Sequence, residues 1–186
     1  GLRVVTPAFA DDAAGLLRTA MRSRGLTVFL EPKHLYNLPA ARAHVPEAFA
    51  VPFGKARVRR AGRDLTIVSY GTAVHFALEA AELLAKEGTE AEVIDLRSLV
   101  PMDLESVLAS VRRTSRVLVA HEDKVHGGFG GEIASQIQAE AFVWLDAPIG
   151  RVGSTFTPVG FNRILERAIL PNTEKVLKAA KQVLAF

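Results

Sequence analysis

From Leu65 to its C-terminus, the sequence alternates largely apolar runs with stretches whose apolar residues recur at helical spacing. The apolar runs, which we expect to be strands, occupy residues 65–69, 92–96, 116–120 and 149–152. The clearest intervening stretch runs from about Thr72 to Glu87, with apolar residues three and four positions apart. Strands without polar alternation are usually buried on both faces. The alternation therefore predicts a three-layer α/β fold with a mainly parallel sheet.

Helix start signals support this division of the chain. Asp103 precedes an apolar helical face and is expected to cap that helix with its side chain. Gly127–Gly131 leads into a helix that reaches Phe142, and a short helical segment is expected at 161–169. Pro171-Asn172 is expected to start a terminal helix.

The first part of the chain has a different organisation. Residues 2–5 and 27–30 are expected to be strands, with a helix between them that begins near Asp11 and ends before Gly25. One strand–helix–strand piece is too small to fold alone, so it must complete a sheet or pack on a neighbour. Residues 32–53 contain four prolines and no clear period, which is typical of a linker. We therefore place a domain boundary at 32–53, before a second unit at 54–186.

Charge is distributed unevenly along the chain. There are 11 basic and 4 acidic residues through Arg63, but 12 basic and 16 acidic residues after it. Opposite net charge in the two parts suggests two structural units with different neighbours. The basic cluster of Arg57, Arg59, Arg60 and Arg63 lacks interleaved aromatic residues and any nucleic-acid-binding motif. An exposed hairpin is the favoured interpretation of this cluster, and no nucleic-acid partner is expected.

Other features of the composition exclude several classes of protein. The chain has no cysteine, which rules out disulfides, thiolate metal sites and cysteine nucleophiles. No apolar run approaches the roughly 20 residues that a membrane span needs, so no membrane partner is expected. The N-terminus has neither an initiating Met nor the pattern of a signal peptide, and we expect part of the native chain to lie upstream.

The candidate site residues lie around the third predicted strand of the second unit. His121-Glu122-Asp123 follows that strand at its carboxyl end, where open α/β sheets place ligand-binding residues. A histidine beside a carboxylate can act as a general base. Adjacent residues on a strand point to opposite faces, however, so a structural hydrogen bond or an interface contact is favoured for His121 and Glu122.

The segment from His126 to Gly131 is the most distinctive local pattern. Glycines before a helix let backbone N–H groups approach an anion. The spacing is not that of a dinucleotide-binding loop, because position 133 is Ile, and tight turning or close helix packing explains glycines equally well. The candidates for a cleft or an interface are therefore His121, Glu122, His126, Gly128 and Gly130. From the residues alone, the chain is an α/β domain without a self-sufficient active site.

A family resemblance extends over the whole chain. Its motifs are Gly1-Leu-Arg-Val-Val-Thr-Pro7, Phe29-Leu-Glu-Pro-Lys33, Leu35-Tyr36, Gly54-Lys-Ala56, Ser69-Tyr-Gly-Thr72, Glu92-Val-Ile-Asp-Leu-Arg97, Pro101, His121-Glu122, Gly127-Gly-Phe-Gly-Gly-Glu132 and Leu170-Pro-Asn172. In these motifs the chain resembles the C-terminal half of the beta subunit of the thiamine-diphosphate-dependent decarboxylating component of 2-oxo acid dehydrogenase complexes. The resemblance implies that residues 1–31 end a pyrimidine-binding domain and that residues 54–186 form a transketolase C-terminal-type domain.

The resemblance also implies an activity and cofactors for the intact enzyme. The activity is oxidative decarboxylation of a 2-oxo acid with acyl transfer to lipoamide, and Val152–Pro158 with Gly160-Phe-Asn162 favours a branched-chain 2-oxo acid over pyruvate. In the family, thiamine diphosphate and Mg²⁺ are held by a Gly-Asp-Gly…Asn-Asn motif of the alpha part. An activating glutamate and a histidine belong to the earlier part of the beta chain. These groups are not in this sequence, so no catalytic or cofactor-binding residue is assigned. Some relatives bind potassium at the turn that here reads Arg22-Ser-Arg-Gly25, but two arginines disfavour a cation, and no metal site is predicted.

The partners implied by the resemblance are an alpha subunit or alpha region, a second beta subunit, and the peripheral subunit-binding domain of the acyltransferase core. The Phe186 carboxylate, at the end of a helix whose dipole adds negative potential, is the candidate contact for that basic domain. The location implied is the bacterial cytoplasm or the mitochondrial matrix. Two alternatives are the C-terminal domain of a transketolase or deoxyxylulose-phosphate synthase, and a flavodoxin-like module that binds an anion at the glycine turn.

Overall fold

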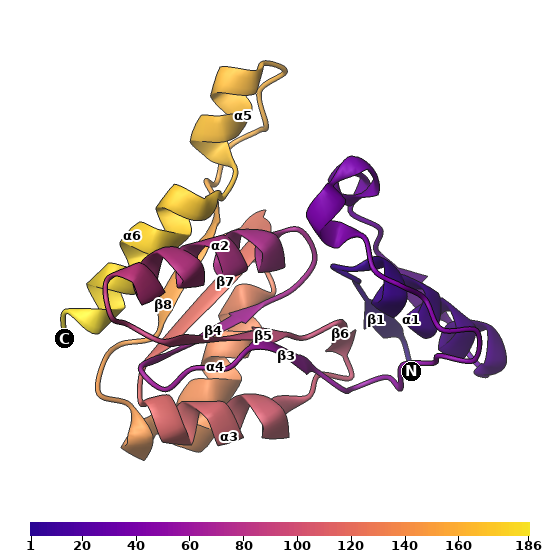
Figure 1. The fold of residues 1–186 in the computed structure, drawn as a ribbon, viewed down its shortest axis with the longest axis horizontal. Helices are drawn as coiled ribbons and strands as arrows, with labels where there is room; N and C mark the ends of the chain where they lie inside the picture. Colours follow the sequence, from indigo (N-terminus) through magenta and orange to yellow (C-terminus); the bar gives the residue numbers. More distant parts are fainter.

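The computed structural model describes all residues from 1 to 186, and its largest element is a five-stranded sheet (Figure 1). The strands lie in the order β3 (Arg57–Arg60), β5 (Ala91–Asp95), β4 (Leu65–Ser69), β7 (Val117–Lys124) and β8 (Gly150–Ser154). β5, β4, β7 and β8 are parallel, and β3 runs antiparallel to β5 at the edge. Every residue of β4 and β5 is buried, as expected for strands with helices on both faces.

Helices cover both faces of this sheet. α2 (Ala73–Lys86) and α6 (Thr173–Leu184) pack on one face, and α3 (Leu104–Thr114) and α4 (Gly130–Ala141) pack on the other (Figure 1). Each face has its own apolar core, of 15 and 13 buried residues. The predicted three-layer α/β fold with a mainly parallel sheet is thus confirmed. No helix combines the length and the apolar character that crossing a membrane requires.

The predicted Asp103 cap is present, and Asn172 caps the terminal helix at its predicted start. The Asp103 carboxylate accepts a hydrogen bond from the backbone N–H of Ser106 at 3.2 Å, and it also accepts one from the Ala56 N–H at 2.9 Å. The Asn172 side chain accepts from the backbone N–H of Lys175 at 3.0 Å. These bonds satisfy N–H groups that the first turn of a helix leaves free, which explains where α3 and α6 begin.

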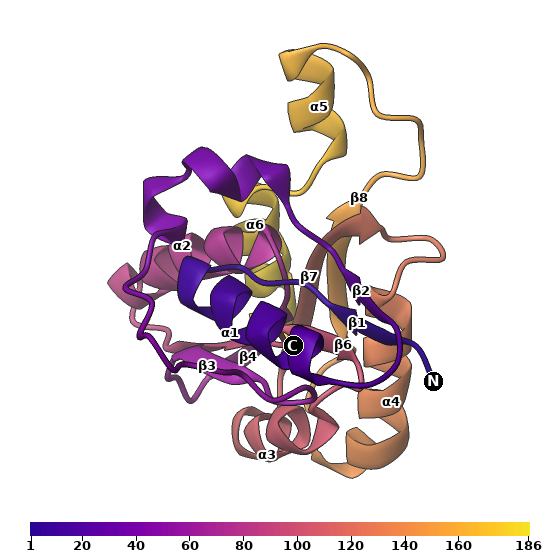
Figure 2. The ribbon, with the colours of Figure 1, turned by 90° about the vertical axis from the view of Figure 1, so that its right-hand side faces the viewer.

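A second, three-stranded sheet lies beside the first. Its order is β2 (Thr27–Phe29), β1 (Arg3–Val5) and β6 (Ser98–Val100), with α1 (Ala10–Arg22) connecting β1 to β2 (Figure 2). β1 and β2 are parallel, as for a strand–helix–strand unit. β6 was not predicted. It comes from the second unit, between β5 and α3, and pairs antiparallel with β1. The linker region holds two short 3₁₀ helices, η1 (Lys33–Asn37) and η2 (Pro39–Ala41).

The basic cluster at 57–63 does not form the predicted hairpin. β3 pairs with β5 and not with the following strand, because β4 lies on the other side of β5. Nor is the cluster uniformly exposed, because the side chain of Arg59 is only 8% exposed.

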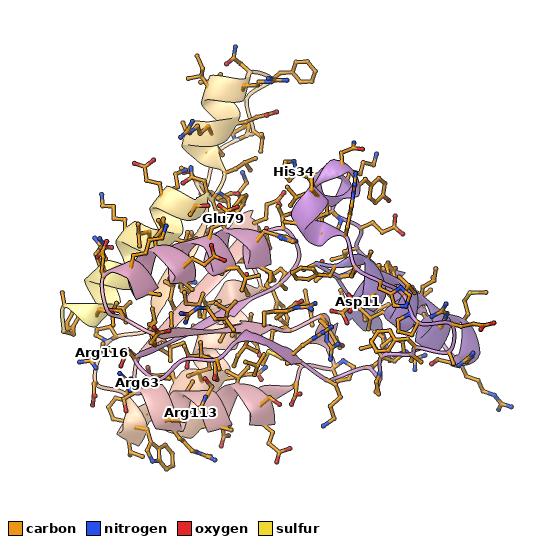
Figure 3. All side chains as sticks on the ribbon, in the orientation of Figure 1. Asp11, His34, Arg63, Glu79, Arg113 and Arg116 are labelled. Atoms are coloured by element: carbon orange, nitrogen blue, oxygen red, sulfur yellow. The ribbon has the colours of Figure 1, made fainter.

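An ion-pair network joins α1 to this edge of the large sheet. The Asp12 carboxylate, which is fully buried, pairs with the guanidinium groups of Arg59 and Arg97, the latter at 2.8 Å. Arg59 also donates to the Asp95 carboxylate at 2.9 Å. Arg57 pairs with Asp11 at 2.8 Å, and Asp11 lies where α1 faces the large sheet (Figure 3). Most of the cluster's positive charge is therefore neutralised within the chain.

One segment extends away from the body. The loop 155–162 and α5 (Arg163–Ile169) project from the end of β8 and return to α6 (Figures 1 and 2). No residue of α5 is buried.

Candidate functional site

The candidate site lies where the strand order of the large sheet reverses. From β4 the chain passes through α2 to β5 on one side, and then through α3 to β7 on the other side of β4. The carboxyl ends of β4 and β7 are therefore neighbours whose connections leave in opposite directions, which opens a crevice in parallel sheets. The residues at these ends are Ser69–Thr72 and Ala120–Glu122.

His121 lies beneath this crevice and is fully buried. Its ring is stacked on that of Tyr70, with centroids 6.0 Å apart and planes 8° from parallel. Desolvation by burial lowers the pKa of His121; the Asp123 carboxylate opposes this shift and Arg151 adds to it. At neutral pH the ring is therefore uncharged, which suits a packed position rather than an ion pair.

The glycines around His121 make room for its ring. A Cβ atom at Gly130 would lie 2.1 Å from the His121 Nε2 atom, and one at Gly153 would lie 2.8 Å from its Cε1 atom. A Cβ at Gly128 would lie 2.1 Å from the Lys124 carbonyl oxygen. The glycines let α4 and β8 approach the ring and β7 closely. The tight-packing interpretation of the glycine loop thus has a definite physical cause.

A hollow of about 290 Å³ opens above the carboxyl ends of the strands. Thr6, Leu30, Glu31 and Pro32 line it from the small-sheet unit, and Tyr70, Gly71, Thr72 and Glu122 line it from the large sheet. We call it the edge hollow. Gly71 has a positive φ of 57°, which turns the chain sharply after β4.

Several buried polar atoms at this edge have no hydrogen-bond partner. They are the Ser69 and Thr72 hydroxyls and both ring nitrogens of His121. Most buried polar groups in proteins are hydrogen-bonded, so a cluster of unpaired ones is unusual and makes this edge a candidate site. By contrast, the buried Thr66 hydroxyl, three residues earlier in β4, lies 2.6 Å from the Ser110 hydroxyl and 2.7 Å from that of Thr114. Four of the five unpaired buried side-chain atoms lie at the carboxyl edge; the fifth, the Nε atom of Arg116, lies just before the amino end of β7.

The candidate residues from the sequence occupy different parts of this edge. Glu122 is exposed and lines the edge hollow, whereas His121 points into the domain, as expected for adjacent residues on a strand. His126 is exposed and packs on Phe156, with ring centroids 4.6 Å apart. Gly128 lies in the turn before α4, and Gly130 is the first residue of α4. Phe186 lies elsewhere, at the free end of α6, and is 73% exposed (Figure 1).

Sequence reasoning missed the contributions of Ser69, Tyr70, Thr72 and Glu31 as site residues. Ser69-Tyr-Gly-Thr72 follows a buried strand and includes a turn glycine, so its position at the carboxyl edge was a usable signal. Glu31 comes from the other sheet, and only the tertiary fold brings it beside Glu122. No group of three or more His, Asp or Glu side chains gathers in a way that could hold a metal ion. At the turn 22–25, the Arg24 carbonyl accepts a hydrogen bond from the Arg3 guanidinium.

The strand order, the two helical layers and the edge crevice define a doubly wound α/β domain of the kind that ends transketolase-like proteins. The family model described as "Transketolase, C-terminal domain" matches residues 54–176, and the chain belongs to this family.

Similarity to named proteins extends over almost the entire chain. It is 41% identical over 98% of its length to the pyruvate dehydrogenase E1 component subunit beta-2, mitochondrial, of Oryza sativa subsp. japonica, covering 49% of that protein. It is 43% identical over 99% of its length to the acetoin:2,6-dichlorophenolindophenol oxidoreductase subunit beta of Cupriavidus necator, covering 54%. It is 40% identical, over its full length, to the pyruvate dehydrogenase E1 component subunit beta of Bacillus subtilis, covering 57%. The chain thus spans about half the length of the curated relatives it matches, and the resemblance drawn from its motifs is confirmed.

Solved structures show the same fold. A split-gene transketolase, described as an inactive beta4 tetramer, superposes with a TM-score of 0.78 at 30% identity, covering 99% of this chain and 57% of that one. A transketolase from Pichia stipitis superposes with a TM-score of 0.59 over the full chain and 25% of its own length, and at 16% identity it supports the fold alone.

Proposed function

We propose that this chain is the C-terminal half of the beta subunit of a thiamine-diphosphate-dependent 2-oxo acid dehydrogenase component. The observation that carries the proposal is the alignment of 98% of the chain, at 41% identity, with a pyruvate dehydrogenase subunit beta. Within that subunit, residues 1–31 would end the pyrimidine-binding domain, 32–53 would be a linker, and 54–186 would form the transketolase C-terminal-type domain.

The residues of this chain fit a supporting role better than a cofactor-binding one. The edge hollow presents the carboxylates of Glu31 and Glu122, which repel a diphosphate rather than bind it. The cofactor's diphosphate and Mg²⁺ would therefore be held by an alpha-type subunit. Once bound in the intact enzyme, the cofactor supplies the electron sink for decarboxylation. The chain itself would hold the subunits in place around that cleft.

The proposal leaves two alternative substrates, a branched-chain 2-oxo acid and pyruvate. Val152–Pro158 and Gly160-Phe-Asn162 resemble the branched-chain type, and we retain a branched-chain 2-oxo acid as the first hypothesis. The names of the relatives favour pyruvate as the second.

The proposed partners are the alpha subunit, a second beta subunit and the subunit-binding domain of the acyltransferase core. Phe186 remains the candidate contact for that basic domain. The exposed side of α6 that leads to Phe186 carries Lys178 and Lys181 as well as Glu174, and Lys181 pairs with Glu87 at 2.7 Å. The proposed location is the bacterial cytoplasm or the mitochondrial matrix, where such complexes work.

The test is reconstitution of the complete beta polypeptide with the alpha-type subunit encoded in the same genome. With thiamine diphosphate and Mg²⁺, the pair should reduce an artificial electron acceptor with 2-oxoisovalerate or pyruvate, and neither subunit alone should do so. Comparing kcat/KM for the two acids decides the substrate hypothesis. Equal activity of the beta polypeptide without its partner would contradict the proposal.

The second candidate is a transketolase, favoured by the 30% identical split-gene structure. The same reconstituted pair would then transfer a ketol group between sugar phosphates and leave the electron acceptor oxidised. An anion-binding module is less well supported, because close packing on Lys124 and His121 accounts for Gly128 and Gly130. Phosphate binding measured by calorimetry on the chain would test it directly.

A further inference from the structure

The edge hollow carries negative charge that the chain does not neutralise. Glu31 lines it from the small-sheet unit and Glu122 from the end of β7, and neither forms an ion pair with a lysine or an arginine. The Tyr36 hydroxyl donates to Glu31, but a neutral donor leaves the charge in place. Other glutamates of the chain do pair with a lysine or an arginine: Glu87, Glu90 and Glu92. The hollow therefore attracts a positively charged group.

The start of α2 forms another wall of the hollow, and its potential has the opposite sign. Gly71 and Thr72, which line the hollow, come immediately before this helix. The first turn of a helix leaves N–H groups unpaired and carries the positive end of the helix dipole. No side chain caps α2, in contrast to α3 and α6, which Asp103 and Asn172 cap. The first N–H groups of α2 thus favour a negatively charged group, such as a carboxylate.

Hydroxyl groups complete the polar lining. Thr6, Tyr70 and Thr72 all line the hollow and are only 4%, 9% and 4% exposed. The Thr72 hydroxyl has no hydrogen-bond partner. The Thr6 hydroxyl lies against the turn before α2, since a Cβ atom at Gly71 would be 3.0 Å from it. A hydroxyl can both donate and accept, so these groups can bond an ammonium or a carboxylate. A ligand that bonded the unpaired hydroxyl would remove the cost of leaving it unsatisfied.

A ligand that carries both charges matches the hollow better than an ion of either sign. The two glutamates repel a simple anion, and the start of α2 offers nothing to a simple cation. The volume of about 290 Å³ is close to the lower limit of roughly 300 Å³ for small-molecule sites, which suits a compact molecule. Leu30 and Pro32 add an apolar wall. A zwitterion with a short apolar side chain fits all of these features.

We propose that the edge hollow binds a free α-amino acid with a short apolar side chain. Its ammonium group pairs with Glu31 and Glu122, and its carboxylate accepts from the first N–H groups of α2. Both sheets supply walls of the hollow, so the bound amino acid also connects the two sheets. The site needs no partner subunit and no cofactor, and it is independent of the proposed function.

The first test is calorimetry of the complete polypeptide that contains this chain, titrated with L-alanine and with each half of its zwitterion. Ethylamine keeps the ammonium group and lacks the carboxylate, whereas propionate keeps the carboxylate and lacks the ammonium group. L-alanine should bind, and ethylamine and propionate should each bind at least about 10-fold more weakly, because each loses one set of charged hydrogen bonds. Absence of L-alanine binding at about 10 mM overturns the proposal. So does equal affinity for ethylamine or for propionate, because the hollow would then recognise a single charge.

The second test places the ligand in the hollow. Glu122→Gln keeps the shape of the side chain and removes one of the two charges, so the affinity for L-alanine should fall at least about 10-fold. The melting temperature should stay unchanged, because Glu122 is exposed and holds no ion pair. The matched control is Glu140→Gln, an exposed residue of α4 that does not line the hollow, and it should bind L-alanine as the native chain does. Native affinity in the Glu122→Gln variant overturns the proposal. Turnover of a 2-oxo acid is measured separately, so failure of one proposal leaves the other standing.

Discussion

Two groups of buried polar side chains lie where the large sheet meets the small-sheet unit, and their hydrogen bonding differs sharply. In the network between α1 and the β3–β5 edge, the Asp12 carboxylate pairs with Arg59 and Arg97, and the Asp95 carboxylate pairs with Arg59 and accepts from the backbone N–H of Arg97. At the carboxyl edge of β4 and β7, the buried hydroxyls and the His121 ring have no partners.

The two groups should therefore contribute differently to the stability of the fold. A fully paired buried network is costly to break, because each removed partner leaves a buried charge behind. Removing a buried group that has no hydrogen-bond partner breaks no hydrogen bond, so its removal should cost little stability. The ion-pair network therefore fixes α1 on the large sheet, whereas the unpaired groups at the carboxyl edge add no hydrogen bonds that hold it in place.

The largest expected effect is on the network side. Asp12→Ala leaves the Arg59 and Arg97 guanidinium groups without their shared carboxylate, and it should lower the free energy of unfolding by about 3–5 kcal/mol. Urea denaturation measures this loss. Asp11→Ala is the matched control: its partner Arg57 is 44% exposed, so the loss should be about 1 kcal/mol or less. Equal losses for the two neighbours would remove the distinction between a buried and a surface pair.

Next in size is the contact between α4 and His121. Gly130→Ala places a methyl group against the His121 ring and should cost about 1–3 kcal/mol. Adding His121→Ala should recover part of this loss, because the two changes share one space. The control is Gly131→Ala, whose Cβ would meet only the flexible end of Arg151 at 3.1 Å. Strictly additive effects of Gly130→Ala and His121→Ala in denaturant unfolding would contradict the packing explanation.

A smaller effect compares two hydroxyls of β4 directly. Thr66→Val removes a hydroxyl bonded to Ser110 and Thr114 and should cost about 1 kcal/mol. Ser69→Ala removes an unpaired hydroxyl and should change stability by less than about 0.5 kcal/mol in either direction. Thermal unfolding of the two variants side by side gives the difference. A Ser69→Ala loss as large as that of Thr66→Val would show that the Ser69 hydroxyl is satisfied.

The smallest effect is a dependence on pH. Burial lowers the pKa of His121 below its usual value of 6.5, so the unfolded chain takes up a proton at a higher pH than the folded chain. The contribution of His121 to stability is therefore present above pH 6.5 and is lost as pH falls through its folded pKa. His121→Asn should reduce the drop in melting temperature between pH 7.5 and 5.5, whereas the exposed-site change His44→Gln should leave the drop as it is.

Local patterns allowed much of the fold to be predicted. The bounds of β4 agree residue for residue with the predicted strand 65–69, because a strand covered on both faces is mostly apolar and carries no charged residue here. The starts of α3 and α6 followed from Asp103 and Asn172, whose short polar side chains bond the first turn. Both features depend only on neighbours in sequence.

The features that were missed depend on distant partners. β6 has three residues, and its pairing with β1 joins positions nearly a hundred residues apart. Asp12 and Arg97 are 85 positions apart, and no periodicity relates them. At the site, the glycine loop gave a correct signal for close packing, but its partner, the His121 ring, became evident only in three dimensions.

β6 follows β5 of the large sheet in sequence but pairs with β1 of the small sheet, and this limits how the two sheets can move. Hinge closure of two lobes needs connections that bend without breaking structure. Here β1 pairs with β6, and the Thr6 N–H donates to the Arg97 carbonyl at 2.9 Å, so opening the lobes would cost strand hydrogen bonds. Adaptation to a neighbour is therefore expected in side chains and in the segment 155–169, while the two sheets should keep their relative orientation.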